Sequence, residues 1–135
     1  MAKPELTKQL LARTLKELMQ DTHLDKISVK NIVDACGLNR KTFYYHFRDK
    51  QDLVCWIFDN EFASINDLDQ DNSIFDDLIE HMYDNKDFYI DALTSEAQNN
   101  LREHFYTLIS QDLYQRIYAQ VDPGRRREEG IRIIV

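Results

Sequence analysis

Residues 27–53 read ISVKNIVDACGLNRKTFYYHFRDKQDL, and this stretch decides the fold. Ser28 can cap a helix over 29–36, in which apolar side chains recur at three- and four-residue spacing. Gly37 stands where a helix commonly ends in a left-handed conformation, and Asn39 can cap the helix that follows. The pattern therefore predicts two short helices that meet at a glycine turn, which is the layout of a helix-turn-helix.

The second helix of this pair, predicted from Arg40 to about Arg48, has a surface suited to contact nucleic acid. Phe43 and Phe47 are four residues apart and share one face, which leaves the polar and tyrosine side chains on the remaining surface. A helix-turn-helix places its second helix in the major groove of DNA, where threonine methyls and tyrosine rings can touch base edges. We therefore expect contacts with base edges from three outward side chains, those of Lys41, Thr42 and Tyr44.

The same residues carry a family pattern. Over about residues 7–58 the chain resembles the TetR family of bacterial transcription regulators, at Ile32, Gly37, Leu38, Thr42, Phe43, Tyr44, His46, Phe47, Lys50 and Leu53. The resemblance implies an all-α protein in which a three-helix helix-turn-helix DNA-binding head is followed by a helical regulatory domain. Within the family, residues 24–27 and 43–47 together with Trp56 look like the subgroup described as activators of dihydroxyacetone kinase operons.

This resemblance, together with the donors that stand near helix ends, predicts how the head holds the DNA backbone. Hydroxyl, amide, imidazole and cationic side chains all donate hydrogen bonds to phosphate oxygens. The predicted phosphate contacts are Ser28, Lys30, Asn39, Arg40, Tyr45, His46 and Lys50. His46 has an alternative role, which is to pack beside the following helix and cap it.

Apolar side chains at helical spacing predict the remaining elements. The expected helices run from about Thr7 to Asp21, from Lys50 to about Ile65, from about Ser73 to Asn85, from Asp87 to Leu93, and from Ser95 or Glu96 to Val121. Residues 22–27 and 66–73 are predicted to be connectors. The composition, 43% hydrophobic with three Gly and two Pro, favours a mostly helical globular protein. We place a DNA-binding domain at residues 1–58 and an effector-binding and dimerisation domain at residues 59–135.

The formal net charge of −7 conceals an asymmetry along the chain. Residues 1–56 hold ten Lys and Arg against seven Asp and Glu, whereas residues 57–135 hold seven against seventeen. The basic part coincides with the helix-turn-helix, and DNA would repel the acidic part, which helps to orient the protein. No apolar run approaches the ~20 residues of a membrane span and no apolar signal segment opens the chain, so a cytoplasmic protein without membrane contact is expected.

The acidic part is also rich in aromatic residues, and a small-molecule effector or a co-regulator protein is expected to act on it. The candidate lining of a ligand pocket is Trp56, Met82, Tyr83, Phe88, Tyr89, Phe105 and Tyr106, with ordinary core packing as the alternative for each. One helix carries Asp76, Asp77, Glu80 and His81. This cluster is interpreted as a solvated acidic face, and neither a metal nor a cofactor is expected.

Two other functions are compatible with a helical protein of this size. One is a small hydrolase or transferase with a histidine as its base, and the other is a protein-interaction module without specific DNA binding. No Ser or Cys nucleophile stands in a recognisable turn motif, and the sequence has no glycine-rich phosphate loop. The sequence therefore predicts a regulator that binds a double-stranded DNA operator, with no catalytic residues.

The end of the sequence departs from the family pattern. TetR-like regulators usually continue into two further long helices that build a four-helix dimer interface, whereas this sequence stops after GIRIIV at residues 130–135, where an apolar segment begins. A truncated regulatory domain is therefore expected. Because proteins of this type read two half-sites by two-fold symmetry, a homodimer is the expected functional unit.

Overall fold

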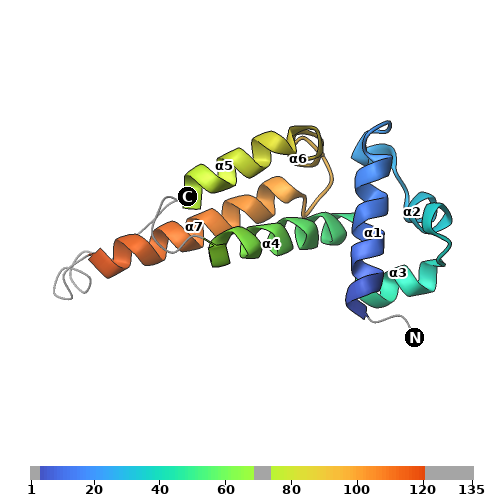
Figure 1. Cartoon of the computed structure of the whole chain (residues 1–135), viewed down its shortest axis with the longest axis horizontal. Coiled ribbons are helices and arrows are strands. Elements are labelled where there is room, and N and C mark those ends of the chain that lie inside the picture. Colours follow the sequence, from blue (N-terminus) through green and yellow to red (C-terminus); the bar gives the residue numbers. More distant parts are fainter. Residues whose placement is uncertain (1–3, 69–73, 121–135) are drawn as a thin grey trace. The chain divides into compact units, whose positions relative to one another are not determined.

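A computed structural model describes residues 4–68 and 74–120 of the chain, and the regular elements within those ranges are all helical. Figure 1 shows their order along the chain. The elements are α1 (Pro4–Leu18), the 3-10 turn η1 (Leu24–Lys26), α2 (Val29–Cys36), α3 (Arg40–His46), α4 (Lys50–Leu68), α5 (Ile74–Asp84), α6 (Lys86–Leu93) and α7 (Leu101–Gln120). The predicted all-α class with a three-helix head is confirmed.

The chain forms two compact units, residues 1–101 and residues 102–135. The first unit contains every element from α1 to α6, and α4 runs through it without a break at residue 58. In the second unit, the part that the structure describes is the body of α7. The apolar end at residues 130–135, on which the expected truncation rests, lies outside the described residues.

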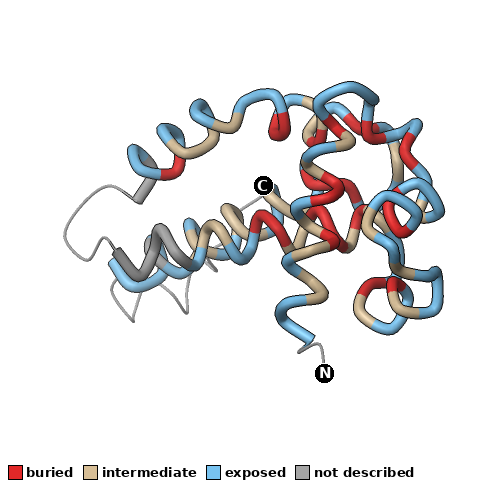
Figure 2. Tube along the Cα trace, turned by 45° about the vertical axis from the view of Figure 1, so that its right-hand side comes forward, coloured by how far each residue is buried: buried red, intermediate tan, exposed pale blue. Residues whose placement is uncertain are grey.

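The core of the first unit forms where α1 packs against α2, α3 and α4. Leu11 and Leu15, from the apolar stripe of α1, are fully buried, as are Ile32 of α2 and Phe43 of α3. Figure 2 marks the buried positions in red. The core continues along α4 toward α6, where Tyr89 packs edge-on against Phe58 with ring centroids 6.3 Å apart. The core of the first unit therefore extends from the head along α4 to α6.

The caps predicted around the glycine turn are confirmed. Ser28 and Asn31 form a capping box at the start of α2, in which each side chain accepts a hydrogen bond from the other residue's backbone N–H. Gly37 ends α2 in the left-handed region with φ 74°, and the Asn39 side chain caps α3. The ends of α2 and the start of α3 are thus fixed by local hydrogen bonds within residues 28–42.

Several helix limits differ from those expected. α1 lies about three residues earlier than predicted, and the predicted linker before α2 contains η1. The long helix predicted from Ser95 or Glu96 begins at Leu101 instead. The reason is that the buried Ser95 and Asn100 hold a turn: the Asn100 Nδ2 donates to the Ser95 carbonyl at 2.7 Å, and the Ser95 hydroxyl is bound elsewhere. Side chains that bond to nearby backbone compete with helix formation in this way.

The left-handed residue of the turn offers a test of the local fold. Gly37→Ala should lower the free energy of unfolding by about 1 to 2 kcal/mol, because a Cβ disfavours this conformation even though open space surrounds the position. Gly37→Asn, the matched control, should lose less because Asn tolerates positive φ. Urea unfolding followed by circular dichroism measures both, and equal losses would contradict a conformational origin.

Candidate nucleic-acid interface

Two buried phenylalanines hold α3 and leave most of its other side chains in solvent. Phe43 is fully buried and Phe47 is 4% exposed, whereas Tyr44 is 54% exposed and Tyr45 is 81% exposed. Phe47 also packs edge-on against Trp56 of α4, with ring centroids 6.0 Å apart. The helix is therefore fixed from behind by aromatic packing, and its opposite face is the surface that a partner can reach.

The residues predicted to read base edges lie on this outer surface. Lys41 and Tyr44 are both exposed and, three residues apart, share a face of α3. Thr42 is half-buried, and its hydroxyl donates to the Asn39 Oδ1 at 3.0 Å. The methyl group and the lone pairs of that hydroxyl remain for an outside partner. Their contact with base edges remains a prediction.

The caps of α2 and α3 place polar side chains beside this surface. The Ser28 Oγ accepts from the Asn31 backbone N–H at 3.0 Å, and the Asn39 Oδ1 accepts from the Thr42 backbone N–H at 2.8 Å. Both capping residues are exposed. Capping uses only acceptor oxygens, so the hydroxyl hydrogen of Ser28 and the amide hydrogens of Asn39 stay available to phosphate oxygens.

Three further predicted phosphate ligands are exposed as well. Arg40 occupies the first position of α3, and Tyr45 projects from its second turn. Lys30 forms an ion pair four residues along α2, with its Nζ 2.6 Å from the Asp34 Oδ2. Because exposed pairs of this kind contribute little to stability, Lys30 can exchange that partner for a phosphate at small cost.

The ring contacts of His46 in the structure are with its two neighbours in the sequence. Its ring packs edge-on against Tyr45 at 5.0 Å and lies 6.4 Å from the ring of Phe47, so packing of His46 beside the next helix stays a prediction. The cap of α4, however, is the Asp49 side chain, which accepts from the Asp52 backbone N–H at 2.8 Å. A phosphate contact of His46 remains a prediction.

Lys50 has partners inside the protein that the sequence did not suggest. Its ammonium donates to the carbonyl of Leu24 at 2.7 Å and to that of Ile27 at 2.6 Å, and so ties the start of α4 to both ends of η1. Burial lowers the pKa of Lys50, and the nearby carboxylates of Asp25 and Asp91 oppose this shift. An ammonium has three hydrogens, so a phosphate can use at most the remaining one.

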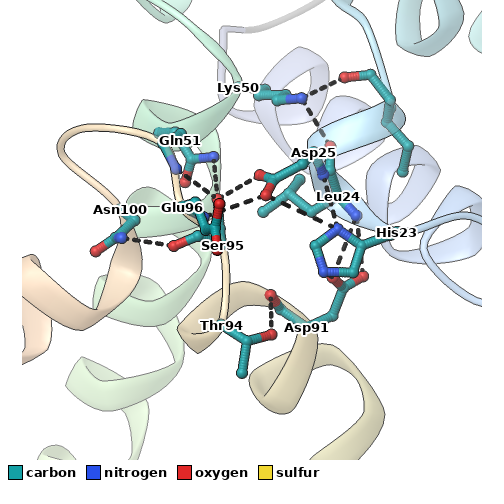
Figure 3. Close-up of polar contacts among 12 residues, drawn as sticks. His23, Leu24, Asp25, Lys50, Gln51, Asp91, Thr94, Ser95, Glu96 and Asn100 are labelled. Atoms are coloured by element: carbon teal, nitrogen blue, oxygen red, sulfur yellow. Dashed lines mark hydrogen bonds and ion pairs between the residues drawn. The ribbon is translucent and has the colours of Figure 1, made fainter.

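A pair of carboxylates joins the loop before α2 to the residues around the end of α6 (Figure 3). Asp91 of α6 accepts from the Leu24 backbone N–H at 3.1 and 3.2 Å. In the opposite direction, Asp25 accepts from the Ser95 hydroxyl at 2.5 Å and from the Glu96 backbone N–H at 3.1 Å. The hydrogen bond from Ser95 is the main cause that lowers the pKa of Asp25. We call this arrangement the carboxylate exchange.

His23 completes the carboxylate exchange through both of its ring nitrogens. Its Nδ1 accepts from the Asp25 backbone N–H at 3.1 Å, while its Nε2 lies 3.0 Å from the Asp91 Oδ1. A ring nitrogen that accepts carries no hydrogen, so the hydrogen must be on Nε2, where it can be donated to Asp91. The interaction therefore does not require the charged form of His23.

A second polar cluster links α1 to α5 and α6 through the Glu61 carboxylate of α4. Lys16, His81 and Tyr89 all bind this carboxylate, with His81 Nε2 at 2.7 Å. Burial raises the pKa of Glu61, but the hydrogen bonds from Lys16, Tyr89 and His81 outweigh burial and leave it below its ordinary value. Burial is also the main reason that the pKa of Tyr89 is raised. We call these four residues the Glu61 cluster.

The predicted ligand-pocket residues have differing surroundings. Phe88 and Tyr89 are buried, Met82 is half-buried and Tyr83 is exposed, whereas Trp56 lines a cavity between α1 and α4. Phe105 and Tyr106 lie on α7, half-buried and exposed respectively. The Trp56 cavity includes none of the other six. A common pocket for this set remains a prediction.

Other chemistry finds little support in the described ranges. Within residues 4–68 and 74–120, no group of three or more His, Cys, Asp or Glu side chains is arranged to hold a metal ion. Cys36 and Cys55 are both free thiols, and burial raises the pKa of Cys55 to about 12, which disfavours the reactive thiolate. The helices that the structure describes include none long and apolar enough to cross a membrane.

Comparisons with known proteins point to one family. The family model described as bacterial regulatory proteins, tetR family, matches residues 11–55, and a model for a transcriptional regulator C-terminal region matches residues 69–134. The HTH-type dhaKLM operon transcriptional activator DhaS of Lactococcus lactis subsp. lactis (strain IL1403) is 29% identical over 124 residues. This match covers 87% of the chain and 63% of that relative, so the chain spans less than two thirds of the relative's length.

The fold comparison agrees with the sequence comparison. A solved structure of the dihydroxyacetone kinase operon activator DhaS is similar with a TM-score of 0.60 and 29% identity, and the match covers 86% of this chain and 67% of that one. The likeness therefore extends beyond the helix-turn-helix into the helices that follow it.

The carboxylate exchange can be tested by removing one partner. Asp91→Ala should lower the free energy of unfolding by about 1 to 3 kcal/mol, because the Leu24 backbone N–H loses its acceptor. Asp87→Ala, an exposed aspartate on the same helix, should change it by less than about 0.5 kcal/mol. Urea unfolding measures both, and similar values for the two variants would show that the exchange does not stabilise the fold.

Proposed function

We propose that this chain, which belongs to the TetR family of bacterial regulatory proteins, regulates transcription by inserting α3 into the major groove of a specific DNA operator. The observation that carries the proposal is the exposure of Tyr44 and Tyr45 on a helix whose phenylalanines are buried. These two rings and the polar side chains beside them form an outward surface that a DNA partner can cover. In this reading the chain is a binding protein and not an enzyme.

The contacts with DNA divide into two kinds in this proposal. Lys41, Thr42 and Tyr44 read base edges, because they lie on the outer face of α3. Donors along α2 and α3 and at the start of α4 hold phosphates and so fix the register. These phosphate ligands are Ser28, Lys30, Asn39, Arg40, Tyr45, His46 and Lys50, and two of the three ammonium hydrogens of Lys50 are already bound within the protein.

Residues 1–58 form the DNA-binding domain in this proposal, and residues 59–135 form the domain on which an effector or a co-regulator acts. The carboxylate exchange supports these two roles, because it connects α6 of the second domain directly to the loop that precedes α2 in the first. The excess of acidic residues in the second part keeps that part away from DNA. Because its relative DhaS is described as an operon activator, we propose that this chain also activates transcription.

The functional unit in this proposal is a cytoplasmic homodimer. A single helix-turn-helix buries little DNA surface, whereas two heads about 34 to 36 Å apart read two half-sites on one face of the duplex. Selection of bound DNA from a random pool should therefore enrich a two-fold symmetric sequence. Enrichment of an asymmetric site would contradict the dimer, and the absence of any enriched sequence would contradict specific recognition.

Mutations can separate the residues that read base edges from those that bind phosphates. Tyr44→Ala should weaken binding to the selected operator by about 1 to 3 kcal/mol with a smaller loss on random DNA, since it removes a contact with a base edge. Arg40→Ala is the contrast: it should weaken binding to all sequences and reduce the slope of log affinity against log salt by about one. A fluorescence anisotropy titration at several salt concentrations measures both. Equal losses of Tyr44→Ala on operator and random DNA would refute the reading role.

A further inference from the structure

A cavity of about 290 Å³ lies between α1 and α4, within the first unit. It lies outside the predicted DNA-contacting surface of α3, and a role for it is not part of the function proposed above. The residues that line it are Gln9, Ala12, Arg13, Lys16, Trp56, Ile57, Asn60 and Glu61. Four come from each helix, so a molecule bound here would contact both α1 and α4.

The walls of this cavity combine an apolar surface with an available cation. Ala12, Trp56 and Ile57 form the apolar side. Among the charged residues, Lys16 is already bound to the Glu61 carboxylate. The Arg13 side chain is exposed, and within the described parts of the chain no partner is found for it.

A second cation adds to the positive charge nearby. The Lys8 Nζ lies 5.9 Å from the centroid of the Trp56 ring. The charge around this side of α1 therefore favours an anion. A guanidinium presents two parallel N–H groups that match the two oxygens of a carboxylate.

We propose that this cavity binds a small organic carboxylate with a flat apolar body, whose carboxylate pairs with Arg13 and whose body lies against Trp56. The size agrees, because a closed cavity of about 150 Å³ holds a benzene molecule, and about 290 Å³ in this site, which is open to solvent, has room for a ring with a short carboxylate arm. The volume is at the lower limit of the range typical for ligand pockets, which favours a small ligand.

A ligand in the cavity is connected to α3 through the ring of Trp56. Trp56 packs on Phe47, the C-cap of α3, and the Phe47 ring lies 5.8 Å from that of Phe43. On its other side the cavity borders Lys16 and Glu61, which belong to the Glu61 cluster. As far as it concerns regulation, this inference rests on the proposed function. A ligand that fits one position of α4 against α1 better than another changes operator affinity when DNA also distinguishes the two positions, and by no more than the ligand's own difference in binding free energy.

The test uses the full 135-residue chain without DNA. Trp56 is its single tryptophan, so both its fluorescence and its indole N–H resonance report on the cavity directly. Phenylacetate is the probe, and phenylacetamide is the neutral analogue of the same shape. We expect saturable changes of both signals with phenylacetate, and about two- to fivefold weaker binding of phenylacetamide, since the pair with the exposed guanidinium is lost.

A matched pair of variants tests the role of the guanidinium. Arg13→Gln should remove the preference for phenylacetate over phenylacetamide while keeping the helical circular dichroism, because the Arg13 side chain is exposed. Lys26→Gln, which removes an exposed cation outside the cavity, should keep the preference. If Arg13→Gln keeps the preference, the assigned carboxylate partner is wrong.

Two further outcomes of the probe titrations would contradict the proposed site. No saturable change with either probe would show that the cavity is not a site for this ligand class, and equal affinities in the unmodified chain would show that the anion is not recognised. Because no DNA is present, these failures leave operator recognition untouched. If phenylacetate binds but leaves operator affinity unchanged, the site stands and its regulatory role is refuted.

Discussion

The burial of Phe43 and Phe47 is the interaction on which the rest of the head depends. Each fully buried phenylalanine stabilises a fold by about 1.5 to 3 kcal/mol, so the pair is sufficient to fix the rotation of a seven-residue helix that has little stability of its own. A rotation of α3 by one residue would bring Tyr44 toward the core and turn Phe43 toward water. Core packing therefore determines the proposed recognition surface, because the side chains of α3 opposite the buried phenylalanines are the ones that face solvent. Trp56 takes part in the same packing, which makes α4 part of the support for α3.

The parts of the fold that the sequence predicted well are those encoded by neighbouring residues. The limits of α2, its cap at Ser28 and the left-handed Gly37 all depend on groups within a few positions of one another, and the structure confirms them. The contacts that the sequence missed join residues far apart: Leu24 with Asp91, or Asp25 with Ser95. Sequence periodicity does not indicate such pairings. The spacing of apolar residues in an amphipathic helix is the same whether a carboxylate on its polar face meets water or a backbone N–H. Lys50 shows the same limit, since the sequence suggested a phosphate ligand but did not indicate the two carbonyls that Lys50 binds within the protein.

The aromatic residues of α5 and α6 show why burial resists prediction from composition. Tyr83 and Tyr89 are both tyrosines on consecutive short helices, yet one is exposed and the other is buried. The difference lies in the partner available to each hydroxyl: Tyr89 donates to Glu61, which satisfies the polar group inside the core. Tyr83 instead carries the ammonium of Lys86 over its ring at 4.8 Å, a contact that needs no burial. The burial of Tyr89 thus depends on Glu61, which stands 28 positions earlier in the chain.

The polar contacts around η1 determine how the head can respond to α6. If α6 moves away from η1, the Leu24 N–H loses Asp91 and the Glu96 N–H loses Asp25, whereas the two carbonyl bonds of Lys50 are unaffected because both groups belong to the head. η1 then stays attached to α4, and α2 follows η1 through its cap at Ser28. The apolar contacts of α1 with α2, α3 and α4 remain as well. The bonds between the head and α6 can therefore break while the bonds within the head persist, and α3 keeps the packing that fixes its outward face when they do.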